Sequence, residues 1–527
     1  MTSRREFLTG ALLSSAAAAR AQTDAGQTSR WQAGSVEHLL PTASHNRILL
    51  KTSLRDAQTR PPLLRVGKRS IAGQRTDTAG RFWSFDAPNL GAGEPHQLEL
   101  LDAGNRPLCD PWTVKTFPAP GSEPERFRLL VYTCAGGDER LGGGHKHNFL
   151  SIAIRRRFFA RALSFQPDAV VANGDHIYWD LDQTGAPPPY TEDVVKAVGT
   201  FDRTLPVLGA ANELVHQRIG EAQIRSLYGN LFREIPAFFL QDDHDYFEND
   251  VGTDQMVTFP PDHFMLQLGR ASRRLYFPEF LPDPNRPAGL PGASAPDTPP
   301  GVGESYGTIR FGRLAEILLY DCRRYLTLAG SSAVIVPRET ENWLMARMAD
   351  REVRHVVQIP SLPPVWSAGK WGDWYPDFLD DEGVLGIKKP KPYWQPGWLA
   401  QLDRLMKSAS AMPDRVALLI SGDLHAIAKA AVQQSGALDL SANPVHVVLP
   451  GPISTLNGWP SRGRDTPPLP SQHVKIDAAI PALEENGFLI ADFTPAAIHL
   501  SFFRWSPALP ESAIDNLVPF KEIELRR

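Results

Sequence analysis

The sequence predicts an α/β protein in which a small all-β sandwich domain precedes a layered domain of β-sheets flanked by helices. From about residue 35 to residue 118, short alternating apolar runs are separated by Gly, Pro, Asn and Asp, a pattern typical of a sandwich. After residue 127, longer continuous apolar runs alternate with helical stretches, which favours parallel sheets built from βαβ units. The 527 residues suffice for two to four domains at about 100–200 residues each.

Residues 1–22 are predicted to be a signal peptide of the twin-arginine type. Arg4 and Arg5 precede an apolar stretch over residues 10–19, and small residues follow at the expected cleavage positions, Ala19 and Ala21. We therefore expect the twin-arginine export machinery to carry the protein to the periplasm or the extracellular space. Residues 23–35 are polar and are expected to form a flexible N-terminus of the mature chain.

The β-sandwich domain is predicted over residues 36–118, with strands near residues 47–52, 81–85 and 97–101. It contains no cluster of catalytic residue types. A Pro- and Gly-rich segment follows, which predicts a linker over residues 119–126.

The layered domain is predicted over residues 127–527. A strand at 128–132, a helix at about 147–165 and a strand at 168–172 form a βαβ unit. Two irregular stretches, 281–302 and 366–398, are expected to be long loops, and whether they cover a site is left open. Further expected elements are helices at 339–351 and 398–408 and strands at 317–321, 354–359, 415–420, 445–449 and 487–491.

Composition excludes several classes of protein. The net charge of −4 and the isoelectric point near 6.4 lack the basic character of a nucleic-acid binder. No run of about 18 apolar residues appears, so no membrane span is expected in the mature chain. Three cysteines exclude a disulfide scaffold, although a single bridge between Cys109 and Cys322 remains open.

Four segments place metal-binding residue types where apolar strands are predicted to end. In open α/β sheets, binding sites form at this edge. A lone cysteine there is more often a buried apolar residue than a ligand, and an acidic run can be an exposed loop. Asp423 and His425, two residues apart, are expected to point the same way from an extended strand end. The segments contain Cys134; Asp175 and Tyr178; Asp243 and His244; and Asp423 and His425.

The order Gly-Asp, then Asp-His-Asp, then Gly-Asp-Leu-His resembles the calcineurin-like metallophosphoesterase superfamily. Three features are similar to its PhoD-like alkaline phosphatase D family: Cys134 in place of an opening Asp-x-His, Tyr178 after Gly-Asp, and Asp-Asp-His in place of Gly-Asn-His. The resemblance implies a metallophosphoesterase-type layered domain and a dinuclear metal site.

The resemblance also implies a role for each residue. Cys134, Asp175, Tyr178 and His425 would hold the first metal, ferric iron, with Asp175 as the bridging ligand. Asp243 and Asp423 would hold the second, for which their carboxylates favour calcium or another divalent cation such as magnesium, manganese or zinc. His244 would bind no metal and would protonate the leaving oxygen or stabilise the transition state, and Asp175 would be the second catalytic residue.

The function implied is that of an exported alkaline phosphatase or phosphodiesterase, which hydrolyses small or polymeric phosphate esters through a metal-bridging hydroxide. One departure is that the strand over 354–359 lacks the further histidine that the superfamily usually supplies; His355 lies near its start and is not taken as a ligand. Arg323 and Arg324 either contact phosphate or form structural ion pairs. Two alternatives stay open: a non-catalytic envelope binding protein, and a metal-dependent ester, lactone or phosphotriester hydrolase.

Overall fold

The structure is a computed structural model that describes residues 31–139, 149–179, 196–246, 260–281, 304–327, 330–367, 395–456, 458, 461, 468–471 and 473–527. The predicted signal peptide, most of the predicted N-terminal segment and nearly all of the two predicted long loops lie outside these residues. Within the described part, no helix is both long and apolar enough to cross a membrane.

The N-terminal part consists of two antiparallel sheets that share one apolar core. Trp83 and Leu50 from the first sheet and Leu98 and Val114 from the second are buried together in that core. The first sheet has the order β1 (Val36–Ala43), β2 (Ile48–Leu54), β6 (Phe82–Ala87) and β5 (Gln74–Arg75), and the second has β4 (Arg69–Ala72), β3 (Leu63–Val66), β7 (Pro95–Leu101) and β8 (Trp112–Lys115).

Two larger sheets form the centre of the rest of the chain. In the six-stranded sheet β9, β10 and β11 are parallel, as the βαβ pattern predicts, and the C-terminal strands continue the sheet beside β9, each antiparallel to its neighbour. Its order is β11 (Ala237–Leu240), β10 (Ala169–Asn173), β9 (Phe127–Thr133), β22 (Asn486–Phe493), β23 (Ile498–Trp505) and β24 (Lys521–Leu525).

The eight-stranded sheet has a parallel centre, in which β13, β14, β16 and β19 are neighbours in register. Its order is β12 (Tyr306–Phe311), β13 (Ala315–Tyr320), β14 (His355–Pro360), β16 (Leu418–Ile420), β19 (Val445–Pro450), β17 (Ile427–Ser435) and β18 (Leu438–Asp439), and β21 (Val474–Leu483) pairs with β17. A short pair, β15 (Trp366–Ser367) and β20 (Leu469–Pro470), lies apart from it.

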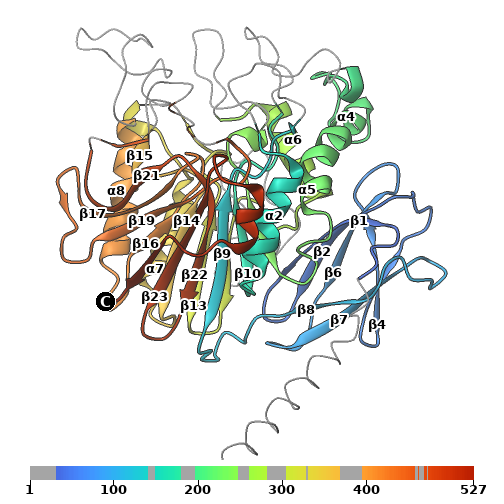
Figure 1. Cartoon of the computed structure of the whole chain (residues 1–527), viewed down its shortest axis with the longest axis horizontal. Helices are drawn as coiled ribbons and strands as arrows, with labels where there is room; N and C mark the ends of the chain where they lie inside the picture. Colours follow the sequence, from blue (N-terminus) through green and yellow to red (C-terminus); the bar gives the residue numbers. More distant parts are fainter. Residues whose placement is uncertain are drawn as a thin grey trace, which may run out of the picture.

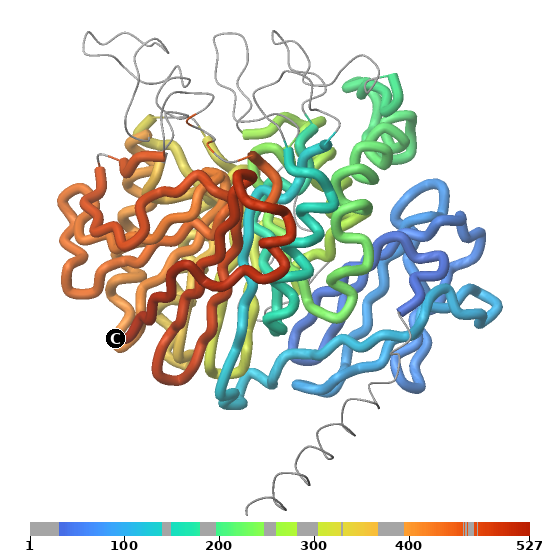
Figure 2. The backbone as a smooth tube through the Cα atoms, viewed as in Figure 1, coloured from blue at the N-terminus to red at the C-terminus, as the bar shows by residue number. Residues whose placement is uncertain are grey.

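Helices cover the outer face of each large sheet (Figures 1 and 2). Alternate residues of each strand enter different cores: Leu130 and Tyr132 of β9 pack under the helices, whereas Leu129 and Val131 pack between the two sheets. Burial on both faces explains why these strands appear as continuous apolar runs. The helices are α2 (Ile152–Leu163), α4 (Ala211–Gly220), α5 (Ser226–Tyr228) and α6 (His263–Leu275) over the six-stranded sheet, and α7 (Arg338–Ala349) and α8 (Pro396–Ser410) over the eight-stranded sheet.

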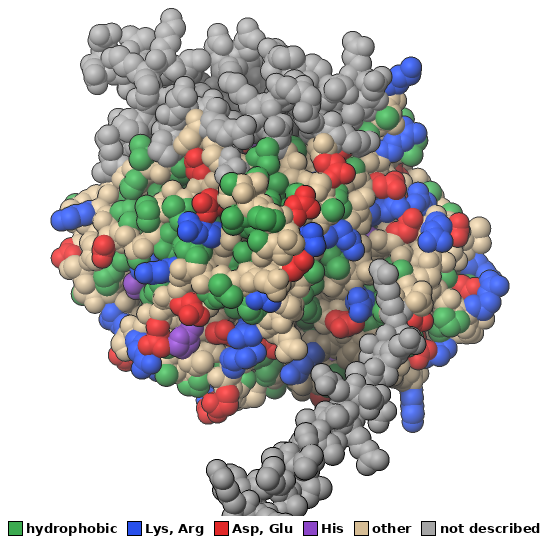
Figure 3. All heavy atoms as spheres, in the orientation of Figure 1, with side chains coloured by type: hydrophobic (Ala, Val, Ile, Leu, Met, Phe, Trp, Pro, Cys, Tyr) green, Lys and Arg blue, Asp and Glu red, His purple; other side chains and the backbone are tan. Residues whose placement is uncertain are grey.

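The predicted fold class is therefore confirmed: a helix–sheet–sheet–helix body follows an all-β N-terminal part. Cys109 and Cys322 are both buried free thiols, so the bridge left open by the sequence does not form. On the face shown in Figure 3, acidic and basic side chains of the described residues are interspersed, in keeping with the small net charge.

Partly buried polar contacts join the N-terminal sheets to the layered body. The Lys51 ammonium lies 2.7 Å from the Glu279 carboxylate and is 3% exposed. The Thr78 backbone N–H and hydroxyl both donate to Glu213 Oε1, at 2.8 and 2.9 Å. His38 of β1 is fully buried at the same junction, edge-on to the Tyr276 ring with 5.7 Å between ring centroids.

The buried His38 predicts acid sensitivity of folding. Burial and the nearby Arg225 charge lower its pKa to about 3. In the unfolded chain it takes up a proton near pH 6.5, so stability is complete above that pH and falls as the pH is lowered toward 3, by about 1.4 kcal/mol per pH unit. Below pH 6.5, the free energy of unfolding measured in urea should depend less steeply on pH in His38→Leu than in the wild type, by about this amount per pH unit. The exposed His263→Gln is the control, and equal slopes in His38→Leu and the wild type would contradict the prediction.

Candidate metal centre

The predicted ligands gather where the parallel strands of both sheets end. Asn173 of β10 pairs in register with Thr133 of β9, so Cys134 and Gly174 leave the sheet at the same level. The Thr133 hydroxyl accepts a 3.3 Å hydrogen bond from the Asp423 backbone N–H, which joins the end of β9 to the loop after β16. Segments far apart in the sequence thus meet at one edge because parallel strands end together.

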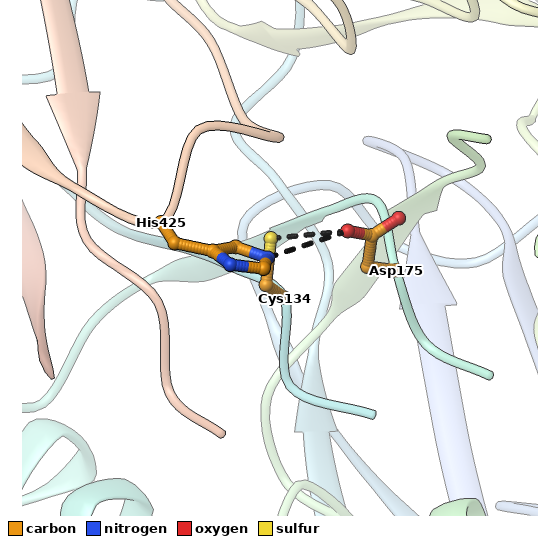
Figure 4. A group of neighbouring side chains, drawn as sticks. All are labelled: Cys134, Asp175 and His425. Carbon is orange, nitrogen blue, oxygen red and sulfur yellow. Dashed lines mark hydrogen bonds and ion pairs between the residues drawn. The ribbon is translucent and has the colours of Figure 1, made fainter. Parts of the chain in front are cut away.

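The four side chains predicted for the first metal gather around the Asp175 carboxylate. The Asp175 Oδ2 atom lies 3.2 Å from Cys134 Sγ, 3.0 Å from the Tyr178 hydroxyl and 3.9 Å from His425 Nε2. The Tyr178 hydroxyl is 3.2 Å from His425 Nε2. In Figure 4, Cys134, Asp175 and His425 come from separate segments and point toward one another.

The remaining predicted residues adjoin this cluster. In the described part of the chain, three groups have ligand atoms within 4.8 Å of one another: Cys134, Asp175 and His425; Asp175, Asp243 and His244; and Asp242, Asp243 and Asp423. Asp175 and Asp243 each belong to two groups, so the three form one continuous cluster. The structure therefore brings all seven predicted site residues together and adds Asp242.

The backbone is unusual at this cluster. Among the described residues, eight that are not glycine have a positive φ, and four of the eight are predicted ligands: Cys134 at 49°, Asp175 at 57°, Asp423 at 67° and His425 at 35°. Such residues are uncommon, and they concentrate at functional sites because packing must hold them in place. This feature supports a site whose side-chain directions matter.

One local expectation was wrong. Asp423 and His425 do not point the same way from an extended strand, because β16 ends at Ile420. Instead the Leu424 N–H donates to the Gly422 carbonyl at 2.9 Å and the His425 N–H to the Asp423 carbonyl at 2.9 Å. The first of these tight turns is centred on Asp423, whose φ is 67°, and Asp423 and His425 belong to different groups of the cluster.

Asp245 fixes two of the loops to each other. Its carboxylate accepts hydrogen bonds from the backbone N–H groups of Asp175 at 2.8 Å, His176 at 2.9 Å, Ile177 at 3.1 Å and Asp242 at 3.0 Å. Asp245 is 1% exposed. Charge-assisted hydrogen bonds of this kind are strong, so Asp245 positions the Asp175 and Asp242 segments together.

Two further buried side chains hold the loops that carry Cys134 and Tyr178. Gln223 accepts from the backbone N–H groups of Gly137 and Tyr178 and donates to the Tyr178 carbonyl, at 2.7 to 2.8 Å. It lies in a π-helix, Glu221–Arg225, an irregularity often found at functional sites. Arg155 of α2 donates to three consecutive carbonyls, those of residues 135–137, which follow Cys134.

The electrostatics of the cluster favour a bound cation. Burial first, and the Asp175 charge second, raise the pKa of the Cys134 thiol and of the Tyr178 phenol. Burial also raises the pKa of Asp242, which the neighbouring carboxylates raise further and Arg323 opposes. Burying several carboxylates together is costly without positive charge. Carboxylate, thiol, phenol and imidazole together are a donor set that fits transition and alkaline-earth metal ions.

The two arginines left open by the sequence both form buried ion pairs. Arg323 bridges Asp242 and Asp423, and Arg324 lies 2.9 Å from the Glu304 carboxylate. His355 is the first residue of β14, and its ring bonds to the Thr494 carbonyl at 2.7 Å. His355 therefore lies at the end of β14 that is farther from the cluster, which agrees with the sequence analysis, where it was not taken as a ligand.

Sequence reasoning assigned no role to four contributors: Asp242, Asp245, Gln223 and Arg155. Asp242 and Asp245 flank two predicted residues in one polar run, which was the available signal. Arg323 was considered, but its partners were not. Gln223 had no signal, because its role depends on a helix irregularity 45 residues beyond Tyr178.

No protein-family model and no curated protein matches the sequence. Solved structures do match. The chain is similar to a structure of PhoD, with a TM-score of 0.56, 13% identity, and coverage of 93% of this chain and 88% of that one. It is also similar to the purple acid phosphatase PPD1 from yellow lupin (Lupinus luteus) seeds, with a TM-score of 0.53, 11% identity, and coverage of 93% and 74%. The chain therefore has the metallophosphoesterase fold that its motifs lead one to expect.

Proposed function

We propose that the chain is an exported metal-dependent phosphoesterase that hydrolyses phosphodiesters, phosphomonoesters or both. The observation that carries the proposal is the convergence of Cys134, Asp175, Tyr178, Asp243, His244, Asp423 and His425 into one buried cluster at the carboxyl edge of a metallophosphoesterase fold. The positive φ values at four of these residues support a site selected for geometry.

Each side chain has a proposed role. Cys134, Asp175, Tyr178 and His425 would hold ferric iron, since thiolate and phenolate are suitable donors to it. Asp243 and Asp423, with Asp175 shared, would hold calcium or another divalent cation. When bound, the two cations would neutralise charge on phosphate oxygens and acidify a water molecule.

His244 is proposed to protonate the leaving oxygen of the ester. It keeps 8% exposure, the highest of the seven predicted residues, and its ring lies 4.0 Å, centroid to centroid, from that of Tyr178. A proton donor must reach both the cluster and the substrate, and this placement is suitable for such a donor. Asp245 and Gln223 would keep the supporting loops in register during turnover.

Metal content is the first measurement. The mature chain purified without chelator should contain iron and a second divalent metal in comparable amounts, and should hydrolyse bis-p-nitrophenyl phosphate, p-nitrophenyl phosphate or both. Removal of the divalent metal should abolish turnover, and its return should restore it. Turnover of p-nitrophenyl acetate in the same assay measures the alternative ester chemistry.

The outcomes are distinct. A chain that contains no metal and takes none up would exclude the proposal and favour a binding function. A chain with metal that cleaves only the carboxyl ester would keep the metal centre and exclude the phosphoesterase. Export is tested separately: replacement of Arg4 and Arg5 by lysines should retain the protein in the cytoplasm if residues 1–22 are a twin-arginine signal.

A further inference from the structure

Arg323 places a fixed positive charge inside the carboxylate group that would hold the second cation. Its Nε atom lies 2.5 Å from Asp242 Oδ1, and its Nη2 atom lies 2.9 Å from Asp423 Oδ2. The Arg323 and Asp242 side chains are completely buried and that of Asp423 is 5% exposed. Asp242 and Asp423 form one metal-capable group with Asp243. Two of the three carboxylates in this group are therefore already paired with a guanidinium.

The fold holds Arg323 in this place from several sides. The Cys322 N–H donates to the Ser361 hydroxyl at 3.0 Å, and the Gly422 N–H donates to the Ser361 carbonyl at 3.3 Å. Ser361 follows β14, so the chain before Arg323 and the chain before Asp423 meet at the end of that strand. The backbone N–H of Arg323 also donates to Asp321 at 2.7 Å. The guanidinium thus enters the cluster beside the strand end that carries no histidine.

We propose that Arg323 is an internal cation that weakens the binding of the second metal. The inference rests on the proposed function, because it assumes that the cluster binds metal. A guanidinium stays protonated under all ordinary conditions. It repels a divalent cation at close range, and it competes for Asp423 and Asp242.

An ordinary buried ion pair would have a different consequence. If Arg323 only stabilised the fold, its removal would lower the melting temperature and leave cation affinity unchanged or reduced. If it opposes the second cation, its removal frees two carboxylates and deletes a repulsive charge, so affinity must rise. Affinity for a bare cation therefore separates the two roles without reference to turnover.

The test is calorimetric titration of calcium into the mature, iron-containing chain after EGTA has removed divalent cations. Wild-type chain should take up calcium weakly and reversibly. Arg323→Gln should bind it at least about tenfold more tightly. Arg323→Lys keeps the charge and should stay within about threefold of the wild type. Unchanged or weaker calcium binding in Arg323→Gln overturns the inference, as does a wild type that retains calcium through EGTA.

A double variant keeps the test valid if Arg323→Gln fails to fold. Asp242→Asn with Arg323→Gln removes one charge of each sign, so calcium affinity should return to within about threefold of the wild type. A loss of about tenfold or more in the double variant would make Asp242 a required ligand and overturn the inference. A wild type that binds neither iron nor calcium removes the proposed function as well, whereas the preceding outcomes leave it intact.

Discussion

Asp175→Asn should abolish phosphoester turnover and remove both metals, while the chain stays folded. Asp175 belongs to two of the three metal-capable groups, and its Oδ2 atom contacts both Cys134 and Tyr178. An amide has the same shape as the carboxylate but no charge to offer a cation. Turnover of both model phosphate esters and metal content by mass spectrometry are the measurements.

The stability of Asp175→Asn distinguishes a role of Asp175 in metal binding from a role in folding. In the metal-free chain, the Asp175 carboxylate is 1% exposed and lies within one group with Asp243, and a buried carboxylate beside another is costly without a cation. The Asp175 backbone is held by Asp245, which the substitution leaves in place. Metal-free Asp175→Asn should therefore melt no lower than the metal-free wild type.

A surface substitution provides the control. Asp56 is exposed, and Asp56→Asn makes the same chemical change away from the cluster. It should retain wild-type metal content and turnover. Full turnover in Asp175→Asn would contradict the proposed centre, whereas lost turnover together with a large fall in the metal-free melting temperature would indicate a structural role instead.

The site could be predicted from the sequence wherever strand ends determine it. Cys134 directly follows β9 and Asp175 follows β10 by two residues, so the register of parallel strands brings them together. The apolar runs that identify those strands reflect burial on both faces, which is a property of the sequence pattern itself. The layered fold was predictable for the same reason.

The remaining features depend on loop conformation and on partners distant in sequence. The turns after β16 place Asp423 and His425 in different groups of the cluster, and no residue pattern predicts the positive φ values of these two residues. Arg323 lies 81 residues from Asp242 and 100 from Asp423. Such long-range pairs follow from the packing of two sheets, and a single sequence carries no signal for them.

His244→Gln should lower kcat without removing metal, and the size of the loss should depend on the leaving group. A poor leaving group, such as the alkoxide of an alkyl phosphate, needs a proton as the P–O bond breaks, so the loss should reach about 10²–10⁴-fold. A p-nitrophenolate leaves without one, so its loss should be much smaller. A ring nitrogen of His244 also lies within 4.8 Å of carboxylate oxygens of Asp175 and Asp243. If His244 were a metal ligand, its substitution would remove metal and would lower turnover of both esters equally.

The ratio of the two losses therefore decides the role of His244. Measuring kcat for an alkyl and a nitrophenyl phosphate ester, with metal content determined on the same samples, gives both quantities. His355→Gln is the matched control, because it also replaces a buried histidine. His355 lies at the start of β14, and the far end of that strand is about 16 Å away at 3.3 Å per residue. His355→Gln should change neither the ratio of kcat values for the two esters nor the metal content. Equal losses for the two esters with metal retained would exclude proton donation by His244, because that step is the one at which the leaving groups differ.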